Sequence, residues 1–161
     1  MRKGKVFTPT FGRAPGGPYR DIEPVAVVEV SDTEGLRRAF RETIARGNPP
    51  IGPYPRSNPP PVVVKYAGVK SWGAFARGAL PWSIEEENGI IQIIGRRRTP
   101  DGWVEDPEQT IDFPSGTTLD QAIDRMIAIL RDAAQQQWRR GPRAGVISKS
   151  DSGARFIRIF R

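Results

Sequence analysis

The chain has 161 residues, including 16 prolines and 17 glycines but no histidine or cysteine, which excludes histidine-based triads, disulfides and conventional zinc sites. Lys and Arg number 25 against 18 Asp and Glu, a net charge of +7, and the length is that of one domain with a hydrophobic core. No apolar run is long enough for a membrane span and the N-terminus lacks the apolar stretch of a signal peptide, so we expect a cytoplasmic protein.

The two ends of the chain are basic. Residues 1–20 hold five Lys and Arg residues and residues 139–161 hold seven, whereas Asp151 is the only acidic residue in these ends. The body between them carries 13 positive and 17 negative charges, a net charge of −4. The segment 1–23 is rich in Gly, Pro and Arg, so we expect a mostly extended basic arm with a few apolar anchors.

A strand and a helix are the first predicted elements of the body. The β-branched run at 25–30 (VAVVEV) predicts a core strand. Ser31 and Glu34 have the spacing of a capping box, and apolar residues follow at helical spacing. We therefore expect a helix over 33–46.

The next stretch, 48–61, contains seven prolines, which exclude a helix or a central strand. It is predicted to be a stiff surface loop, although its segment 50–53 (PIGP) also has the spacing of a ligand for aromatic grooves. Residues 62–66 (VVVKY) predict a central strand that is apolar on both faces. Ser71 is expected to cap a short helix that packs Trp72 and its apolar neighbours on the sheet.

The region 82–113 predicts an antiparallel meander. Asn88-Gly89 lies between two apolar runs and is a strong signal for a two-residue hairpin turn. A second turn is expected at 100–102 and returns the chain through a short strand, and 110–113 offers one more strand.

The longest predicted helix follows over 117–139, with Thr117 or Thr118 as its cap and one continuous apolar stripe. Beyond it, apolar and basic residues alternate over 155–160. This pattern indicates a terminal edge strand paired with 146–147, or a disordered basic tail, and both interpretations stay open.

Together these elements predict an α/β fold of the α+β type. We expect a mainly antiparallel sheet of about five strands, packed on one face by the two main helices. The single domain is predicted to span 24–140, with the basic arm before it and a basic tail or edge hairpin at 141–161.

The acidic residues of the meander are the candidates for a charged site. If the meander forms, the carboxylates of 85–87 face those of 105–108, and paired carboxylates can serve glycoside hydrolysis or hold a divalent cation. Charge runs beside turns are more often solvated hairpin ends, and the sequence holds no phosphate-binding loop. We therefore expect no catalytic residue, metal ion or cofactor.

Three consecutive arginines, Arg96, Arg97 and Arg98, lie at the far end of a predicted hairpin strand. They could grip phosphates with Trp103 as a stacking surface, and together with the basic ends they keep a nucleic-acid partner open. The alternative interpretation is a solvated turn, whose charge the neighbouring acidic residues balance.

The aromatic residues divide by their surroundings. Trp72, Trp82 and Phe113 lie on predicted apolar faces and are expected in the core. Trp103 is flanked by a glycine and by acidic residues beside a turn. It either anchors a protein partner or covers the end of the sheet.

Five segments of turn, cap and aromatic residues follow the pattern of a known family. They are SWGAF at 71–75, WSI at 82–84, GWVEDP at 102–107, FPSGTT at 113–118 and the helix at 123–130. On these segments, residues 61–134 resemble small immunity proteins of bacterial contact-dependent growth inhibition systems. The resemblance implies a non-enzymatic cytoplasmic protein without a cofactor, which binds and blocks the toxic domain of a secreted effector.

An acidic body without catalytic equipment suits an inhibitor of a basic toxin, because opposed charge favours the right partner. The expected contact surface comprises Glu85, Glu86, Glu87, Trp103, Glu105, Asp106 and Glu108. Two alternatives remain. One is a nucleic-acid-associated protein of phage or mobile-element type, which would use the basic ends and the three arginines, and the other is a structural subunit of a larger assembly.

Overall fold

The computed structural model describes residues 4–16, 19–53, 57, 59–77, 79–99, 102–139 and 155–160, with only the backbone described for 137–139 and 155–160. Its strands are β1 (Lys5–Arg13), β2 (Tyr19–Glu29), β3 (Leu80–Glu87), β4 (Ile90–Thr99), β5 (Gly102–Asp112) and β6 (Arg155–Phe160). Its helices are α1 (Thr33–Arg46), α2 (Val63–Tyr66), α3 (Trp72–Ala76) and α4 (Leu119–Arg139).

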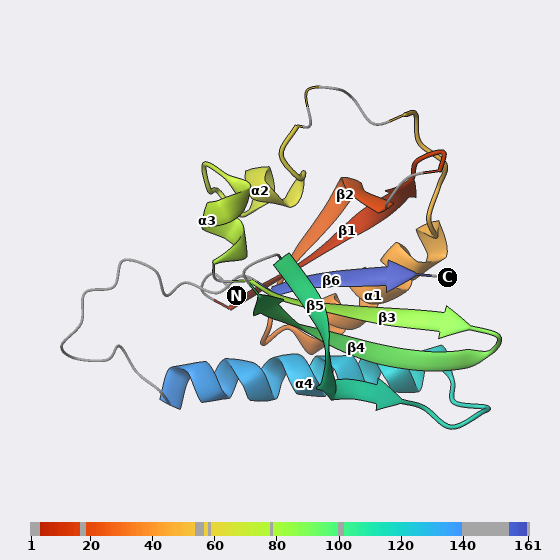
Figure 1. Ribbon diagram of the computed structural model, residues 1–161. Helices are drawn as coiled ribbons and strands as arrows, with labels where there is room; N and C mark the ends of the chain where they lie inside the picture. The colour runs from red at the N-terminus through yellow and green to blue at the C-terminus, as the bar shows by residue number, and fades with distance from the viewer. Residues whose placement is uncertain are drawn as a thin grey trace.

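The strands form one sheet in the order β2-β1-β6-β3-β4-β5 (Figure 1). β1 and β2 pair antiparallel, β3, β4 and β5 form an antiparallel meander, and β6 pairs parallel with both β1 and β3. The α+β class is therefore confirmed. The described chain holds six strands and four helices where the sequence predicts about five strands and two main helices.

The predicted arm at the N-terminus is instead part of the sheet, because residues 5–13 form β1 and β2 begins at Tyr19. The expected anchors are indeed buried, with Val6, Phe7 and Phe11 each at most 2% exposed. β1 lies inside the sheet and helices cover both of its faces, so its side chains are buried in either direction. Because β1 contains glycine and proline, its sequence does not predict a strand in the interior of the sheet.

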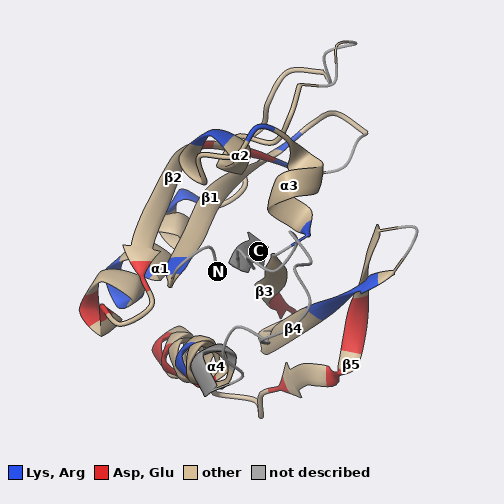
Figure 2. Cartoon of the chain, turned by 90° about the vertical axis from the view of Figure 1, so that its left-hand side faces the viewer, with Lys and Arg blue, Asp and Glu red and all other residues tan. Residues whose placement is uncertain are grey.

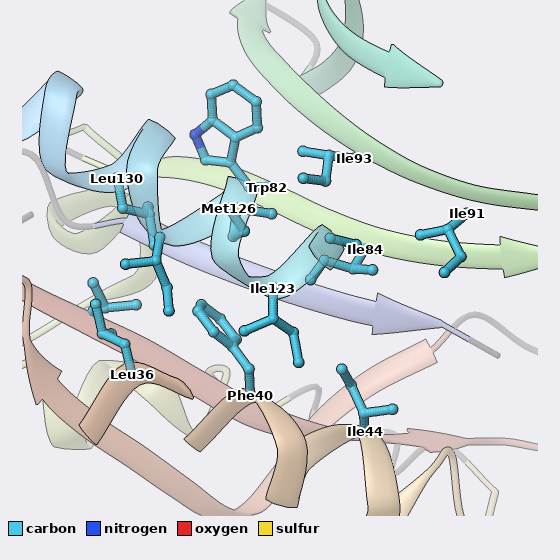
Figure 3. Packing of buried hydrophobic residues seen from close by; sticks show 13 residues of the cluster. Leu36, Phe40, Ile44, Trp82, Ile84, Ile91, Ile93, Ile123, Met126 and Leu130 are labelled. Atoms are coloured by element: carbon cyan, nitrogen blue, oxygen red, sulfur yellow. The ribbon is translucent and has the colours of Figure 1, made fainter. Parts of the chain in front are cut away.

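Helices α1 and α4 cover one face of the sheet and form the main hydrophobic cluster with it (Figure 3). The helices contribute Leu36, Phe40, Ile44, Ala122, Ile123, Met126, Ile127 and Leu130, and the strands contribute Val6, Trp82, Ile84, Ile91 and Ile93. Each of the larger side chains stabilises the fold by roughly 1.5–3 kcal/mol through burial. Trp82 lies in the core as expected, and Phe113 packs against the cluster while partly buried.

Helices α2 and α3 cover the opposite face of the sheet above β1 and β2 (Figure 1). Val63 and Val64 of α2 and Phe75 of α3 join Phe7 of β1 in a second hydrophobic cluster. Trp72, expected in the core, is 37% exposed on α3. The two short helices therefore bury one side against the sheet and leave the Trp72 side chain partly exposed.

Capping side chains fix where the helices begin. α1 is capped by Asp32 rather than by Ser31, because the Asp32 carboxylate accepts a 2.8 Å hydrogen bond from the backbone three residues on. Thr118 caps α4 in a capping box: its hydroxyl accepts from the Gln121 N–H at 3.3 Å, and the Gln121 side chain accepts from the Thr118 N–H at 2.8 Å. Ser71 caps α3 as predicted.

The proline-rich loop begins with contacts to β1. The Arg13 N–H donates a hydrogen bond to the Pro49 carbonyl at 2.9 Å, and the Ile51 N–H donates to the Arg13 carbonyl at 3.0 Å. Within the described residues 48–53 and 59–61 there is no helix and no strand, as the prolines predict.

The prediction of a strand over 62–66 is wrong, because this segment forms α2. The Val64 N–H donates to the Pro61 carbonyl at 3.1 Å, so the prolines lead directly into a turn. The buried Asp21 carboxylate accepts a hydrogen bond from the Val63 N–H at 3.1 Å and satisfies the start of the helix. These tertiary contacts override the β-branched composition, whose preference for strands depends on context.

Strand β5 joins the two short strands that the sequence predicts within its length. Its pairing with β4 is interrupted, since Ile94 opposes Thr110 whereas Arg96 opposes Glu105. Residues 106–109 therefore bulge out from the ladder.

Gly95→Ala is expected to lower the free energy of unfolding by about 1–3 kcal/mol through overpacking. Gly95 lies on β4 opposite the bulge, where an ideal Cβ would come within 2.6 Å of the Gln109 Cβ and 2.8 Å of the Trp82 Cζ3. Carbon atoms that are not bonded to each other do not approach so closely without a shift of one of them. Urea denaturation followed by tryptophan fluorescence measures the change.

Gly73→Ala is the matched control, because a Cβ at Gly73 meets nothing within 4 Å. Gly73 lies in helix α3, where alanine is favoured over glycine by up to about 1 kcal/mol. Equal destabilisation by the two substitutions would contradict the tight packing around Gly95.

Strand β6 lies in the centre of the sheet and not at its edge. It pairs with β1 through Val6 and Phe7, and with β3 along the whole of its length. The expected partner strand at 146–147 lies outside the described residues. Parallel partners far away in the sequence leave no local turn signal, which explains why the sequence predicts an edge strand or a tail.

Candidate functional site

The meander of strands β3, β4 and β5 is the acidic part of the molecule. Residues 80–112, called the acidic meander below, contain eight Asp and Glu residues and three arginines, a net charge of −5. Residues 4–77 contain eleven Lys and Arg against six Asp and Glu, a net charge of +5. The positive charge is thus not confined to the chain ends, and β6 lies between the basic β1–β2 pair and the acidic meander.

The Asn88-Gly89 turn sets which carboxylates share a face of the meander. Both residues have positive φ, 52° and 77°, and Glu87 pairs with Ile90 across a two-residue turn, as the sequence predicts. Because side chains alternate along a strand, Glu85 and Glu87 occupy one face and Glu86 the other. The three consecutive glutamates therefore do not form one patch.

The Arg96 side chain connects all three strands of the acidic meander. Its Nη1 donates a 2.8 Å hydrogen bond to the Ser83 hydroxyl on β3, and its Nη2 lies 3.1 Å from Glu85 Oε1 and 3.5 Å from Glu105 Oε1. The Ser83 hydroxyl donates to Glu85 in turn, at 2.8 Å. The Arg96 side chain is 12% exposed, so these contacts compensate the burial of its charge.

Two of the predicted acidic contact residues, Glu85 and Glu105, are therefore paired with a positive charge of the protein itself. Glu85 and Glu105 come from opposite sides of β4 and converge on one guanidinium, as the meander predicts for the two acidic segments. Figure 2 shows acidic stretches of β3 and β5 and a basic stretch of β4. Glu105 nevertheless keeps 63% of its side chain exposed, whereas Glu85 keeps 27%. Of this pair, Glu105 is the residue open to a partner.

The three predicted nucleic-acid-binding arginines point in different directions. Arg96 is held by the two glutamates, while Arg97 and Arg98 are exposed. Alternation along β4 places Arg97 on the face opposite to Arg98. The structure does not bring the three together into one phosphate grip.

Trp103 and Asp106 make contacts within the protein that stabilise the fold. Trp103 packs against the second hydrophobic cluster and lies opposite Arg98 on β4, so it covers one end of the sheet. Asp106 is 9% exposed, and its carboxylate accepts hydrogen bonds from the Glu108 N–H at 3.3 Å and from the Gln109 side chain at 2.6 Å. Asp106 thus closes the bulge in β5, and Glu108 remains exposed beside it.

Three large apolar side chains of the acidic meander, Leu80, Ile90 and Val104, are exposed and were not predicted from the sequence. Ile90 follows the hairpin turn and is 48% exposed, and Val104 on the edge strand β5 is 39% exposed. The sequence feature that could have predicted the exposure of Ile90 is its position directly after the hairpin turn, where it pairs with Glu87. We call six of the exposed side chains of this region the meander rim: Glu86, Glu87 and Ile90 at the turn, and Val104, Glu105 and Glu108 on β5. The rim extends around both faces of the meander, because Glu87, Ile90 and Glu105 lie on one face and Glu86 and Val104 on the other.

Other acidic residues are engaged in helix packing. Arg37 Nη2 and Asp124 Oδ1 lie 2.7 Å apart, and Arg41 Nε and Asp120 Oδ1 lie 2.8 Å apart, which ties α1 to α4. The hydrogen bond from Arg41 lowers the pKa of Asp120. These pairs sit on the helices and leave the meander rim as the acidic surface with exposed apolar residues.

Neither a metal site nor a membrane segment is built by the part of the chain that the structure describes. Within it, no group of three or more Asp and Glu side chains is arranged to hold a metal ion. None of its helices combines the length and apolar character needed to cross a bilayer. Comparison of the chain with protein-family models, with curated proteins and with solved structures finds no match.

Proposed function

We propose that this protein is an immunity protein, which binds and neutralises the toxic domain of a bacterial toxin through the meander rim. The observation that carries the proposal is the exposure of Ile90 at the hairpin turn, where it lies directly opposite Glu87. Protein interfaces combine an apolar centre with a polar border, and a basic toxin would complete the charge pattern. The resemblance of 61–134 to immunity proteins supports the same conclusion.

The distribution of charge over the fold adds support. Eleven of the 25 residues that would repel a basic toxin lie in 4–77, which forms β1, β2 and the first three helices, and seven more lie in 139–161. The meander rim lies at the other side of the sheet, from the turn after β3 to the edge strand β5. A basic partner therefore meets the acidic side of the molecule without approaching the basic one.

The ion pairs of Arg96 argue against the alternative of a nucleic-acid-associated protein that uses the three arginines. A guanidinium bound to Glu85 and Glu105 would have to leave both carboxylates before it could bind a phosphate. Arg97 and Arg98 alone occupy different faces of β4. This surface is therefore not part of the proposal.

Glu86→Lys combined with Glu87→Lys is expected to slow association with the toxin about tenfold or more, because reversal of rim charges acts mainly on the association rate. The toxin to use is the C-terminal domain of the protein encoded immediately upstream of this gene. Surface plasmon resonance at two salt concentrations measures the rates, and growth of bacteria that express both proteins measures neutralisation.

The matched control is Glu42→Lys combined with Asp132→Lys, which changes the net charge equally at exposed positions of α1 and α4. Equal slowing by both pairs would remove the meander rim as the contact surface and leave neutralisation intact. Failure of the unaltered protein to restore growth would refute the immunity function itself.

A further inference from the structure

The exposed charged and large side chains of helices α2 and α3 and the residues beside them are aromatic or basic. The two helices lie side by side above β1 and β2 (Figures 1 and 2). Their inward residues belong to the second hydrophobic cluster. The aromatic and basic residues among the exposed ones, called the basic-aromatic surface below, are Lys65, Tyr66, Lys70, Trp72 and Arg77.

Trp72 presents an open, flat ring that is held in place from below. Its indole stacks on Phe75, with the ring centroids 5.5 Å apart and the planes at 22°. Phe75 is buried and meets Phe7 edge to face at 5.9 Å, so it is anchored in the core. Phe75 stacks on one face of the indole and Trp72 remains 37% exposed, so part of the ring is accessible to a planar ligand.

The charge around Trp72 has one sign. Residues 59–77 contain Lys65, Lys70 and Arg77 and no Asp or Glu. Lys65 is paired with Glu23 of β2 at 3.2 Å, and its ammonium lies 5.6 Å from the centre of the Tyr66 ring. Lys70 precedes α3 in the sequence and Arg77 follows it, and both side chains are exposed to solvent.

We propose that the basic-aromatic surface binds single-stranded nucleic acid, with a base stacked on the outer face of Trp72 and phosphates close to Lys70 and Arg77. An open aromatic face beside cations is the combination that single-strand-binding proteins use, because every base has a π face and every linkage a negative charge. An acidic peptide would be attracted by the cations but would leave the open indole face unused. This binding is independent of toxin neutralisation at the meander rim.

Fluorescence anisotropy with a labelled uridine oligomer tests the stacking. Trp72→Leu is expected to weaken binding about tenfold, because one stacked base is lost. Trp72→Phe keeps an aromatic face and is expected to retain most of the affinity. Both substitutions are made in the full chain, and circular dichroism checks that the variants are folded.

Salt dependence tests the phosphate contacts. Lys70→Gln combined with Arg77→Gln is expected to make the slope of log Kobs against log salt shallower by about 1.4, at ~0.7 for each phosphate contact of a single strand. Arg38→Gln combined with Arg125→Gln is the matched control, since it removes the same charge from exposed positions of α1 and α4. It is expected to leave the slope close to that of the unaltered protein.

Three results would overturn the proposal. One is the absence of binding to the uridine oligomer at low salt, and another is an equal effect of the two double substitutions, which would make the attraction non-specific. The third is unchanged affinity in Trp72→Leu together with tighter binding of a glutamate-rich peptide, which would assign the surface to an acidic protein segment. These variants are expected to neutralise the toxin as well as the unaltered protein does. Failure of the nucleic-acid proposal would therefore leave the immunity function untouched.

Discussion

A chain that ends after Gly141 is expected to lose cooperative folding, because it lacks β6. Without β6 the central position of the sheet is empty, and β1 and β3 lose the partners that β6 supplies to both of them. Each lost backbone hydrogen bond costs roughly 1 kcal/mol, more where a buried group stays unpaired. The sum is comparable to the whole stability of a small domain, about 5–15 kcal/mol.

Urea denaturation followed by circular dichroism measures this effect as a lower midpoint and a shallower slope. The control is Arg155→Gln combined with Arg158→Gln in the full chain, which removes two of the charges of β6 and keeps its backbone. We expect the control to unfold cooperatively. A truncated chain with the midpoint and slope of the full chain would show that β6 is dispensable.

The position of β6 also bears on how nucleic-acid binding is tested. Deletion of the basic ends would be the natural way to ask whether they bind nucleic acid. It would remove β6, the whole of β1 and the start of β2 together with the charges, so any loss of binding would follow from unfolding. Substitution of the charges with the backbone intact is the interpretable experiment.

Phe7→Ala is expected to destabilise the protein by about 3–5 kcal/mol, the usual cost of truncating a buried phenylalanine. Phe7 is 1% exposed in the second hydrophobic cluster, where its ring meets Phe75. The substitution would leave a cavity between β1 and the short helices α2 and α3. The free energy of unfolding from chemical denaturation measures the loss.

Val27→Ala provides the comparison for Phe7→Ala. Val27 lies directly opposite Phe7 on β2 but is 37% exposed, so its truncation is expected to cost less than about 1 kcal/mol. A loss in Phe7→Ala no greater than that in Val27→Ala would mean that the N-terminal segment is attached loosely, as an arm would be.

Elements with local signals were predicted well. The helix over 33–46 is α1 with the same bounds, since its apolar period lies within the segment itself and its cap, Asp32, directly precedes it. Asn88-Gly89 defines its hairpin because the turn type needs two residues with positive φ. Helix α4 likewise follows from its apolar stripe and its capping threonine.

Elements that depend on distant partners were not predicted. β1 contains glycine and proline, and only its enclosure by β2, β6 and helices on both faces makes it a core strand. Residues 62–66 have strand composition, yet Asp21 and the preceding prolines make them a helix. The contacts that decide these cases connect residues far apart in the sequence.

The candidate surface was predicted in part for the same reason. Hairpin geometry correctly brings Glu85 and Glu105 towards each other, but the sequence does not show that Arg96 lies between them. The exposure of Ile90 and Val104 depends on the absence of a described element over that part of the meander. Composition alone assigns such residues to the core.

The order of synthesis gives the central strand a further consequence. β6 is the last of the described strands to leave the ribosome, although its place is between strands that are made much earlier. The β1–β2 hairpin and the meander can each form while translation continues, but the sheet can close only when β6 arrives. Until then the nascent chain presents two unpaired strand edges, which are sites of aggregation. Slow translation of residues 140–154 would prolong that interval, so yield in cells should depend on how quickly this segment is made.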